Sequence, residues 1–344
     1  MSPDTTTPPV DKPKFTKEDF VSGQEVRWCP GCGDYSILAT MQRTLSKFNI
    51  PREKYVFVSG IGCSSRFPYY MNSYGFHTIH GRAPAVATGL RAIRPDLSIW
   101  VITGDGDGLS IGGNHLLHCM RRNVGVNILL VNNRIYGLTK GQYSPTSPVG
   151  QITKSSPYGS IDHPINALCL AIASEATFIA RTLDTDPVHM GMIMERAAKH
   201  KGVSFVEIYQ NCIIFNDKAF GNVIGRDTKE DRMLYLEHGK QLLFGKQKEK
   251  GIRLKGLHPE IVNVSSVEPK ELVVHNEQDE KPNYPYLLTQ MVYPDMPVPF
   301  GVFRAIQKPT YEEMMDNQVK EAVKVKGKGT LKDLIYGSNT WTVK

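Results

Sequence analysis

The sequence predicts an α/β fold in which a parallel β-sheet is covered by helices on both faces. Short runs of apolar, β-branched residues alternate along the chain with longer stretches whose apolar residues recur at helical spacing. The strand candidates are apolar throughout, as expected for strands buried on both faces. Repeated alternation of strand, helix and strand is typical of a parallel sheet with helical crossovers.

The first predicted helix spans residues 35–47. Asp34 precedes it as a candidate N-cap, and apolar side chains recur along one face from Ile37 to Leu45. The run 55–59 is apolar and should form the first buried strand. These elements begin the α/β alternation.

The alternation continues through the centre of the chain. Residues 82–94 form an alanine-rich helix that should stop before Pro95, and residues 97–103 form the next buried strand. A helix over 112–122 then leads into a strand over 126–131. Two consecutive β-α units of one sheet are therefore predicted here.

A later helix has a clear start signal. Asp186 is a candidate N-cap and Pro187 stands at the first helical position of a helix that runs to residue 200. The strand over 204–209 follows. Beyond residue 215 the composition changes to charged helical pieces over 229–250 and an extended stretch rich in proline and glutamate over 264–285.

The overall composition is that of an ordinary globular protein. The chain has 344 residues, of which 40% are hydrophobic, and is long enough for a sizeable core. Its longest apolar stretch, 167–173, is far shorter than the roughly 20 residues needed to span a bilayer. Residues 1–14 contain several prolines and threonines but lack the apolar core of a signal peptide. We expect a cytoplasmic protein with no membrane span.

The domain boundaries predicted from these features divide the chain into three parts. Residues 1–22 are expected to form a flexible tail, residues 23–215 the main α/β domain, and residues 216–344 an extension that covers a partner subunit or the site. A weakly ordered extension is the alternative for the last part.

The charge of the chain is modestly positive. The formal net charge is +7, with a lysine-rich run over 320–332. This run is either a solvated tail or a surface that attracts an acidic partner. Nucleic-acid binding is not expected, because no aromatic residues are interleaved with these lysines.

Four of the six cysteines fall in loops that should open at one edge of the sheet. Cys29 and Cys32 form a CxxC pair before the first helix, Cys63 follows the strand 55–59, and Cys212 follows the last predicted strand. The CxxC pair alone is compatible with a redox dithiol, a zinc site or an iron–sulfur cluster. Four converging thiolates would suit either zinc or a [4Fe–4S] cluster. The other two, Cys119 and Cys169, lie in apolar helical patterns and should be small buried side chains.

The sequence GDGD at 104–107 predicts a site for a diphosphate and its metal. Glycines at a strand end allow backbone N–H groups to approach a phosphate closely. Asp105 supplies a hard oxygen ligand for Mg²⁺ or Ca²⁺, and Asn133, after the next strand, brings an amide oxygen to the same edge. The carbonyl of Ile135 can complete the set. A plain tight turn is the alternative reading of GDG alone.

Taken together, these motifs resemble a known enzyme family. GDG followed by an asparagine after the next strand resembles the signature of thiamine diphosphate enzymes, which implies that Asp105, Asn133 and the Ile135 carbonyl hold Mg²⁺. The motifs WCPGCGD, GIGCSS, HTIHGRAPAVATGL and GDGD, with the later Cys212, resemble the β subunit of 2-oxoacid:ferredoxin oxidoreductases. The resemblance covers about residues 23–215.

The resemblance implies a set of site residues. Cys29, Cys32, Cys63 and Cys212 would ligate a [4Fe–4S] cluster, which favours iron–sulfur over zinc. The residues implied to surround thiamine diphosphate are Ile61, Gly62, Cys63, Ser64, His80, Gly106, Asp107, Gly137 and Leu138. For His80, a satisfied core or surface histidine is the alternative, but its place beside a predicted helix start favours the cofactor.

Two cationic side chains, Lys140 and Arg66, are candidates for binding the substrate. The family resemblance implies that a basic residue at the position of Lys140 approaches the substrate, although a solvated loop lysine would look the same in sequence. Arg66 follows Cys63 closely and can pair with a carboxylate in bidentate fashion. The alternative is that one cation holds the C1 carboxylate common to all 2-oxoacids, the other contacts the cofactor or coenzyme A, and the partner subunit determines the selectivity.

The resemblance implies oxidative decarboxylation of a 2-oxoacid with coenzyme A, and electron transfer through the cluster to ferredoxin. We favour 2-oxoglutarate, with pyruvate or another 2-oxoacid as the alternative. The chain has no second, pyrimidine-binding domain, so an α subunit is expected to supply it. The rival functions are a non-oxidative thiamine lyase or synthase with structural zinc, and a zinc-containing binding module without catalysis.

Overall fold

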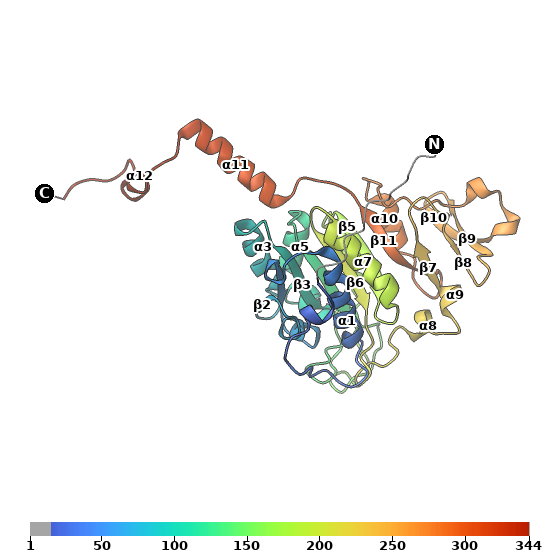
Figure 1. The fold of residues 1–344 in the computed structure, drawn as a ribbon. Coiled ribbons are helices and arrows are strands. Elements are labelled where there is room, and N and C mark those ends of the chain that lie inside the picture. The colour runs from blue at the N-terminus through green and yellow to red at the C-terminus, as the bar shows by residue number, and fades with distance from the viewer. Residues whose placement is uncertain (1–14, 344) are drawn as a thin grey trace, which may run out of the picture.

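The computed structural model describes residues 15–343 and is built around a mostly parallel eight-stranded sheet (Figure 1). The strand order is β2-β1-β3-β4-β6-β5-β11-β7, and the first six strands are parallel. Their bounds are β1 Tyr55–Ser59, β2 Tyr74–His77, β3 Ser98–Gly104, β4 Asn127–Asn132, β5 Phe178–Leu183 and β6 Ser204–Tyr209. The predicted fold class is confirmed.

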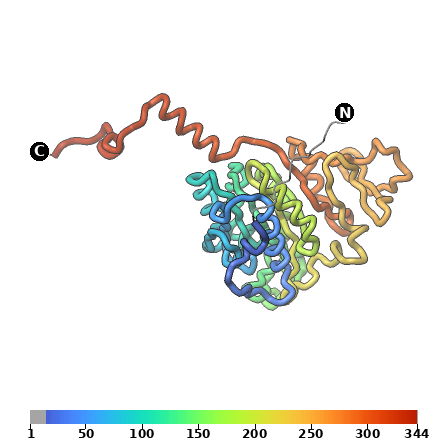
Figure 2. The backbone as a smooth tube through the Cα atoms, in the orientation of Figure 1, coloured from blue at the N-terminus to red at the C-terminus, as the bar shows by residue number. Residues whose placement is uncertain are grey.

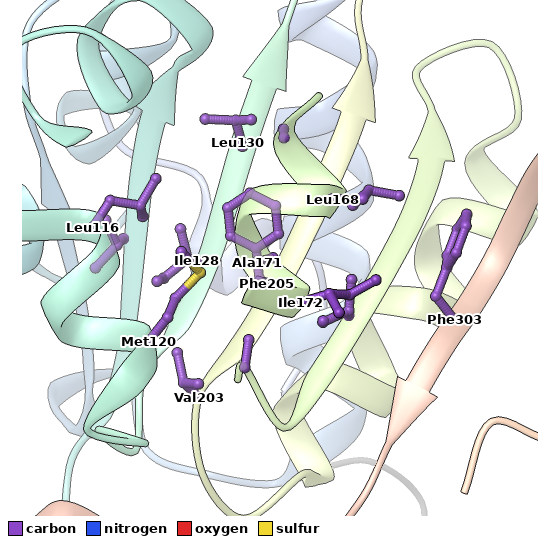
Figure 3. Packing of buried hydrophobic residues seen from close by; sticks show 14 of the residues in the cluster. Leu116, Met120, Ile128, Leu130, Leu168, Ala171, Ile172, Val203, Phe205 and Phe303 are labelled. Carbon is purple, nitrogen blue, oxygen red and sulfur yellow. The ribbon is translucent and has the colours of Figure 1, made fainter. Parts of the chain in front are cut away.

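Helices cover both faces of this sheet because successive side chains of each buried strand point to opposite sides. Ile128 and Leu130 of β4 pack on one face, and Leu129 and Val131 pack on the other. The first face is covered by α3 Ala83–Ile93, α5 Gly113–Arg121, α6 Ala167–Ala173 and α10 Asn283–Thr289. The second is covered by α1 Asp34–Leu45 and α7 Pro187–Lys199. Figure 3 shows the first core, where Phe205 lies among Leu168, Ala171 and Ile128.

The predicted elements before residue 215 are present within one or two residues. Strands 55–59 and 204–209 agree exactly with β1 and β6, and Asp186 caps α7 by accepting a hydrogen bond from His189 N at 3.0 Å. Asp34 differs from the prediction. It is the first residue of α1 rather than its N-cap, because its buried carboxyl group interacts with Cys32 instead of the helix backbone.

The region after residue 215 contributes to the main sheet, contrary to the expected separate extension. β7 Met233–Leu236 and β11 Val298–Ala305 form one end of it, with β11 antiparallel to β5. The expected helical pieces over 229–250 are wrong apart from α9 Lys229–Arg232. The stretch instead contains the short strands β7 and β8 joined by turns, and the buried apolar side chains of β7, such as Met233 and Leu234, complete a sheet edge.

A smaller antiparallel sheet occupies the same part of the chain. It consists of β8 Leu243–Phe244, β9 Lys250–Lys255 and β10 His258–Asn263, in the order β10-β9-β8. The remaining short helices are α2 Phe67–Tyr70, α4 Asp105–Leu109 and α8 Gly221–Ile224. The stretch 264–285 is irregular, as expected, apart from two short 3-10 turns and the start of α10.

The described part of the expected N-terminal tail, residues 15–22, is not a flexible tail. Residues 1–14 of the predicted tail lie outside the described residues. Residues 15–22 are anchored, because Phe20 is fully buried and packs edge-on against Tyr55 of β1 at a ring separation of 5.7 Å.

The last helices extend away from the body. α11 Tyr311–Lys326 begins against α3, where Glu312 pairs with Arg91 at 2.8 Å, and then projects outward with α12 Leu331–Tyr336 beyond it (Figures 1 and 2). Capping boxes at Thr310 and Thr330 start the two helices. None of the described helices is long and apolar enough to cross a membrane.

Candidate cofactor and cysteine site

The carboxyl ends of β1, β3 and β4 meet around a cavity of about 210 Å³. Each strand is followed there by a loop from the sequence prediction, because parallel strands present their carboxyl ends at one edge. The cavity is lined by the predicted residues Ile61, Gly62, Cys63, Ser64, His80, Asp105, Gly106, Asp107, Asn133, Ile135, Gly137 and Leu138. It is also lined by Gly104, Ser110, Ile111, Val131, Tyr136 and Thr139, which were not predicted.

Asp105 is buried at this edge and held by two hydroxyl groups. Its Oδ2 accepts hydrogen bonds from Ser144 Oγ at 2.5 Å and Thr146 Oγ1 at 2.6 Å. Burial raises the pKa of Asp105, and the two hydroxyl donors oppose this rise. Ser144 and Thr146 were missed in the sequence, although a run of hydroxyl residues after a glycine-rich loop is a weak signal for such a contact.

Asn133 and Ile135 lie on the loop that follows β4, at the same edge of the sheet as Asp105. Asn133 Oδ1 accepts a hydrogen bond from Ile135 N at 3.1 Å, which closes a tight turn after the strand. Both residues line the same cavity as Asp105. The structure thus brings the three predicted metal ligands together.

Asp107 has its carboxylate engaged by the protein itself. Oδ1 accepts from Gly81 N at 2.7 Å and Ile61 N at 3.1 Å, and Oδ2 accepts from Thr103 Oγ1 at 2.7 Å. This carboxylate therefore ties the loops after β1, β2 and β3 together. Any contact of Asp107 with a diphosphate must come from its backbone.

Gly106 is needed for the close approach of an aromatic ring. A Cβ atom at this position would lie 2.0 Å from the ring of Tyr136, whose hydroxyl donates to the Gly106 carbonyl at 3.2 Å. A side chain on Gly106 would displace Tyr136 from the cavity wall.

The four predicted cysteines converge on a second cavity of about 210 Å³. Cys29, Cys32, Cys63 and Cys212 all line it, and none of the six cysteines of the chain forms a disulfide. Trp28 donates from Nε1 to the Cys63 carbonyl at 2.7 Å and so joins the CxxC loop to the β1 loop. Cys119 is buried as predicted, whereas Cys169 is half-buried and bonded to Thr289.

The thiols of this group influence one another. Burial raises the pKa of Cys63 to about 12, and repulsion from Asp34, Cys212 and Cys29 adds to this rise. Burial also raises the pKa of Cys32, with contributions from Asp34, Cys63 and Cys212. Backbone N–H groups of residues 214–216 lower the pKa of Cys212 but do not overcome its burial. Four deprotonated thiols here would repel one another unless a positive centre joined them.

Two polar side chains beside Cys32 were not predicted. Gln210 donates from Nε2 to Cys32 Sγ at 3.3 Å. Asp34 is fully buried; this burial raises its pKa to about 7, while its hydrogen bond with Cys32 has the opposite effect. Neither has a sequence signal that links it to the cysteines beyond proximity in the chain.

The two cavities share a wall. Cys63, Asn133, Gly137 and Leu138 line both of them. A Cβ atom on Gly137 would lie 3.6 Å from Cys63 Sγ and 3.5 Å from Cys212 Sγ. The glycine therefore leaves the space between these two sulfurs open.

Arg66 and Lys140 line the cysteine cavity rather than the first cavity. Arg66 donates to the Arg27 carbonyl at 3.3 Å, and neither cation forms an ion pair within residues 15–343. Lys140 has a φ of 76°, in the left-handed region, and a turn fixes it through the bond from Lys140 N to Gly137 O at 3.0 Å. Such a conformation in a non-glycine residue is typical of functional loops.

The side chains described here do not form a compact site for one metal ion. Within residues 15–343, no three His, Cys, Asp or Glu side chains lie close enough to bind a single ion. In the Asp105 group only one of the three ligands is a carboxylate. In the cysteine group the sulfurs surround a cavity rather than a point.

Comparison with known proteins assigns the fold. Residues 60–208 match the family model for the thiamine pyrophosphate enzyme, C-terminal TPP binding domain. This range begins directly after β1, contains β2, β3, β4, β5 and nearly all of β6, and includes every residue that lines the first cavity. The fold and the site thus define a thiamine diphosphate-binding domain.

Similar proteins show which thiamine diphosphate-binding proteins this chain is related to. The chain is 50% identical to 2-oxoglutarate oxidoreductase subunit KorB of Mycobacterium tuberculosis, over 98% of this chain and 90% of that protein. It is 43% identical to 2-oxoacid:ferredoxin oxidoreductase 1, subunit beta, of Aeropyrum pernix, over 61% of this chain and 64% of that subunit. The structure of 2-oxoglutarate:ferredoxin oxidoreductase from Magnetococcus marinus aligns with a TM-score of 0.75 and 31% identity, over 96% of this chain and 98% of that one.

The chain belongs to the family of 2-oxoacid:ferredoxin oxidoreductase β subunits. It is therefore a subunit of a multi-subunit oxidoreductase. The family resemblance predicted from the cysteine and GDGD motifs is confirmed.

Proposed function

We propose that this chain is the β subunit of an enzyme that oxidatively decarboxylates 2-oxoglutarate to succinyl-CoA and CO₂ and passes the electrons to ferredoxin. In this proposal the first cavity holds thiamine diphosphate and Mg²⁺, and the second holds a [4Fe–4S] cluster. The substrate choice is supported by the KorB relative and by the Magnetococcus marinus enzyme, whose structure has 2-oxoglutarate, coenzyme A and succinyl-CoA bound.

The observation that carries the proposal is the wall shared by the two cavities. Cys63 lines both, and Gly137 leaves the space next to its sulfur open. A site for an organic cofactor and a site with four thiols are thus direct neighbours. This arrangement suits an oxidative reaction, because electrons can leave the cofactor without crossing the protein core.

The chemistry of Asp105 fits a bound cation. Its carboxylate is buried and accepts two hydroxyl hydrogen bonds, but it forms no ion pair within residues 15–343. A buried carboxylate is costly unless it is paired or binds a metal. Mg²⁺ between Asp105, Asn133 and the diphosphate would supply the missing positive charge, with oxygen ligands of the kind it prefers.

The cysteine group fits a cluster better than zinc. Zinc draws four ligands to bonding distance of one ion, whereas the cysteines of a [4Fe–4S] cluster bind four different irons and stand further apart. Cys29, Cys32, Cys63 and Cys212 line a cavity of about 210 Å³, which would leave room for a cluster among their sulfurs. The donors to Cys212 and Cys32 are of the kind that stabilise cluster sulfurs.

The chain's own residues would then bind and orient the reactants. When bound, thiamine diphosphate supplies the carbon nucleophile that attacks 2-oxo carbons. The first turn of α4 offers backbone N–H groups without helical partners to the diphosphate. Asp107 fixes the surrounding loops, while Leu138, half-exposed between the cavities, limits the access of water to the shared wall.

The proposed partners are an α subunit, which supplies the pyrimidine-binding domain, and ferredoxin. The segment between β4 and α6 supports a protein interface, because it exposes the large apolar side chains Val149, Ile152, Tyr158 and Ile161. Ile152 lies beside Lys140 and Phe215, close to the cysteine cavity. A partner chain on this segment would therefore lie next to the cysteine cavity, which is lined by Lys140 and Phe215 as well.

The projecting arm over 311–343 is proposed to cover the α subunit. Its apolar side chains Leu334, Ile335 and Trp341 are exposed, and its lysines stand along α11 and α12. Apolar surface on a helix that leaves the body is typical of a segment that binds another chain.

The substrate assignment predicts that Arg66 or Lys140 pairs with the second carboxylate of 2-oxoglutarate. Arg66→Met or Lys140→Met should lower kcat/KM for 2-oxoglutarate by roughly tenfold, about 1.4 kcal/mol, and spare pyruvate. Both acids are assayed with each variant. An equal loss for the two acids would refute selection by that cation, since it would then contact a group common to both reactions.

The function itself is tested by anoxic co-purification with the α subunit and a viologen-reduction assay. We expect CoA-dependent reduction with 2-oxoglutarate and broad visible absorption from the cluster. A colourless, zinc-containing protein that releases CO₂ without reducing viologen would instead support a non-oxidative thiamine enzyme.

A further inference from the structure

A continuous chain of buried polar side chains leads from Asp105 through a loop to the strands β4, β6 and β5. Thr146 Oγ1 lies 2.6 Å from Asp105 Oδ2 and 2.9 Å from Asn132 Oδ1. Asn132 Nδ2 donates to Glu207 Oε1 at 2.8 Å, and Arg181 Nε donates to Glu207 Oε2 at 2.8 Å. All five residues are at least nine-tenths buried.

The register of the sheet places these residues in contact. Leu130 of β4 pairs with Glu207 of β6, and Glu207 pairs with Arg181 of β5. Asn132 lies two residues beyond Leu130 and so points to the same face. This is the face of the core in Figure 3, where Leu130 lies toward the carboxyl end of β4 and level with Glu207 in the sheet register. The polar chain is therefore the layer between the core and the cofactor edge.

Stability does not explain an ion pair at this depth. Arg181 and Glu207 have side chains only 4% and 3% exposed, and burying two charges costs much of what their attraction returns. A well-packed apolar pair is often as stable or more so. Arg181 stacks over Tyr209 at 5.0 Å, so aromatic packing is already available there. We therefore look for a role of the Arg181–Glu207 ion pair other than stabilising the fold.

The ion pair fixes the orientation of the Asn132 amide, and through it the surroundings of the Thr146 hydroxyl. Both side-chain oxygens of Glu207 accept hydrogen bonds, one from Arg181 and one from Asn132. Asn132 must therefore turn its NH₂ group toward Glu207 and its oxygen toward Thr146. The Thr146 hydroxyl is then held between Asn132 Oδ1 and Asp105 Oδ2. Its position against Oδ2 sets the orientation of the Asp105 carboxylate, whose other oxygen accepts from no side chain within residues 15–343.

We propose that Thr146, Asn132 and the Arg181–Glu207 pair are positioning residues that orient Asp105 toward the Mg²⁺ of the diphosphate site. The inference rests on the proposed function, in which Asp105 is a metal ligand. It predicts that residues far from the cofactor control the affinity for Mg²⁺. Residues that support a metal ligand typically change metal affinity by roughly 10–100-fold.

Two sets of variants test this in the complex with the α subunit. Thr146→Val removes the hydroxyl at nearly constant shape, and Thr146→Ser restores it. The double variant Arg181→Met with Glu207→Leu removes the ion pair but leaves an apolar pair in its place. Thr177→Val is the matched control, because Thr177 is a buried threonine that also donates to an asparagine oxygen, at 2.7 Å, but stands before β5 at the opposite edge.

The readout is the Mg²⁺ concentration for half-maximal thiamine diphosphate binding, measured by calorimetry, together with the melting temperature without cofactor. We expect Thr146→Val and the double variant to need roughly tenfold more Mg²⁺, and Thr146→Ser and Thr177→Val to match the unmodified protein. Activity at saturating Mg²⁺ should recover.

Unchanged Mg²⁺ dependence in folded Thr146→Val and double variants would overturn the proposal. If Thr177→Val weakened Mg²⁺ binding equally, the effect would be general destabilisation and the inference would also be wrong. If the unmodified complex bound no thiamine diphosphate with Mg²⁺, the proposed function itself would fail instead. The two failures are thus distinguishable.

Discussion

Asp105→Ala should abolish Mg²⁺-dependent binding of thiamine diphosphate. The substitution removes the one carboxylate among the three proposed ligands and leaves two neutral oxygens, which are insufficient for a metal that demands near-octahedral oxygen geometry. The loss should exceed the roughly 10–100-fold effect typical of residues that only support a ligand. The diphosphate would then lack the cation that offsets its charge.

Calorimetry with and without Mg²⁺ measures this effect. Asp162→Ala is a suitable control, because Asp162 is an exposed loop aspartate that accepts a hydrogen bond from Tyr143 at 2.9 Å and lines neither cavity. Equal thiamine diphosphate affinity in Asp105→Ala and the unmodified complex would exclude Asp105 as a metal ligand.

Cys212→Ala should damage the cluster and stop electron transfer while the fold persists. Cys212 supplies one of the four sulfurs and lies after β6, where its loss leaves the core of the sheet unchanged. Iron content and visible absorption of the anoxic complex should fall, and viologen reduction should fall to background. The circular dichroism spectrum should stay that of an α/β protein.

Cys169→Ala provides the matched control for this variant. Cys169 is also half-buried and also bonded to polar neighbours, at 2.9 Å to Thr289, but it lies on α6 and lines neither cavity. It should retain full iron and full activity. A Cys212→Ala complex with four irons and normal viologen reduction would contradict the ligand assignment.

The convergence of the site could be predicted where it depends on strand ends. Cys63, Asp105 and Cys212 each follow a strand of the parallel sheet directly, so the fold class alone brings them to one edge. The contact of Ser144 with Asp105 could not be predicted, because it depends on the path of a long irregular segment after β4. The bonds of the Asp107 carboxylate could not be predicted either, because its backbone partners, such as Gly81, lie in loops distant in the sequence.

The end of the sheet was missed for another reason. Charged residues are scattered through the sequence after residue 215 and separate short apolar runs such as β7 and β11. Such a run forms a strand when a neighbouring strand has unpaired backbone groups to bond it, as β5 has for β11. A single sequence does not show which strands of a sheet have such an unpaired edge. The ion pair of Arg181 with Glu207 was hidden likewise, since it depends on the register of β5 and β6.

The cysteine cavity reaches the molecular surface at Cys29, which is exposed. Cys63 borders the cofactor cavity, while Cys29 lies at the molecular surface. A cluster held by these sulfurs would face the cofactor on one side and the solvent on the other. An electron acceptor bound at this surface would then receive electrons directly from the cluster, without a second redox centre in this chain. The same opening would admit dioxygen, so lifetime in air should depend on whatever covers Cys29 in the assembled enzyme.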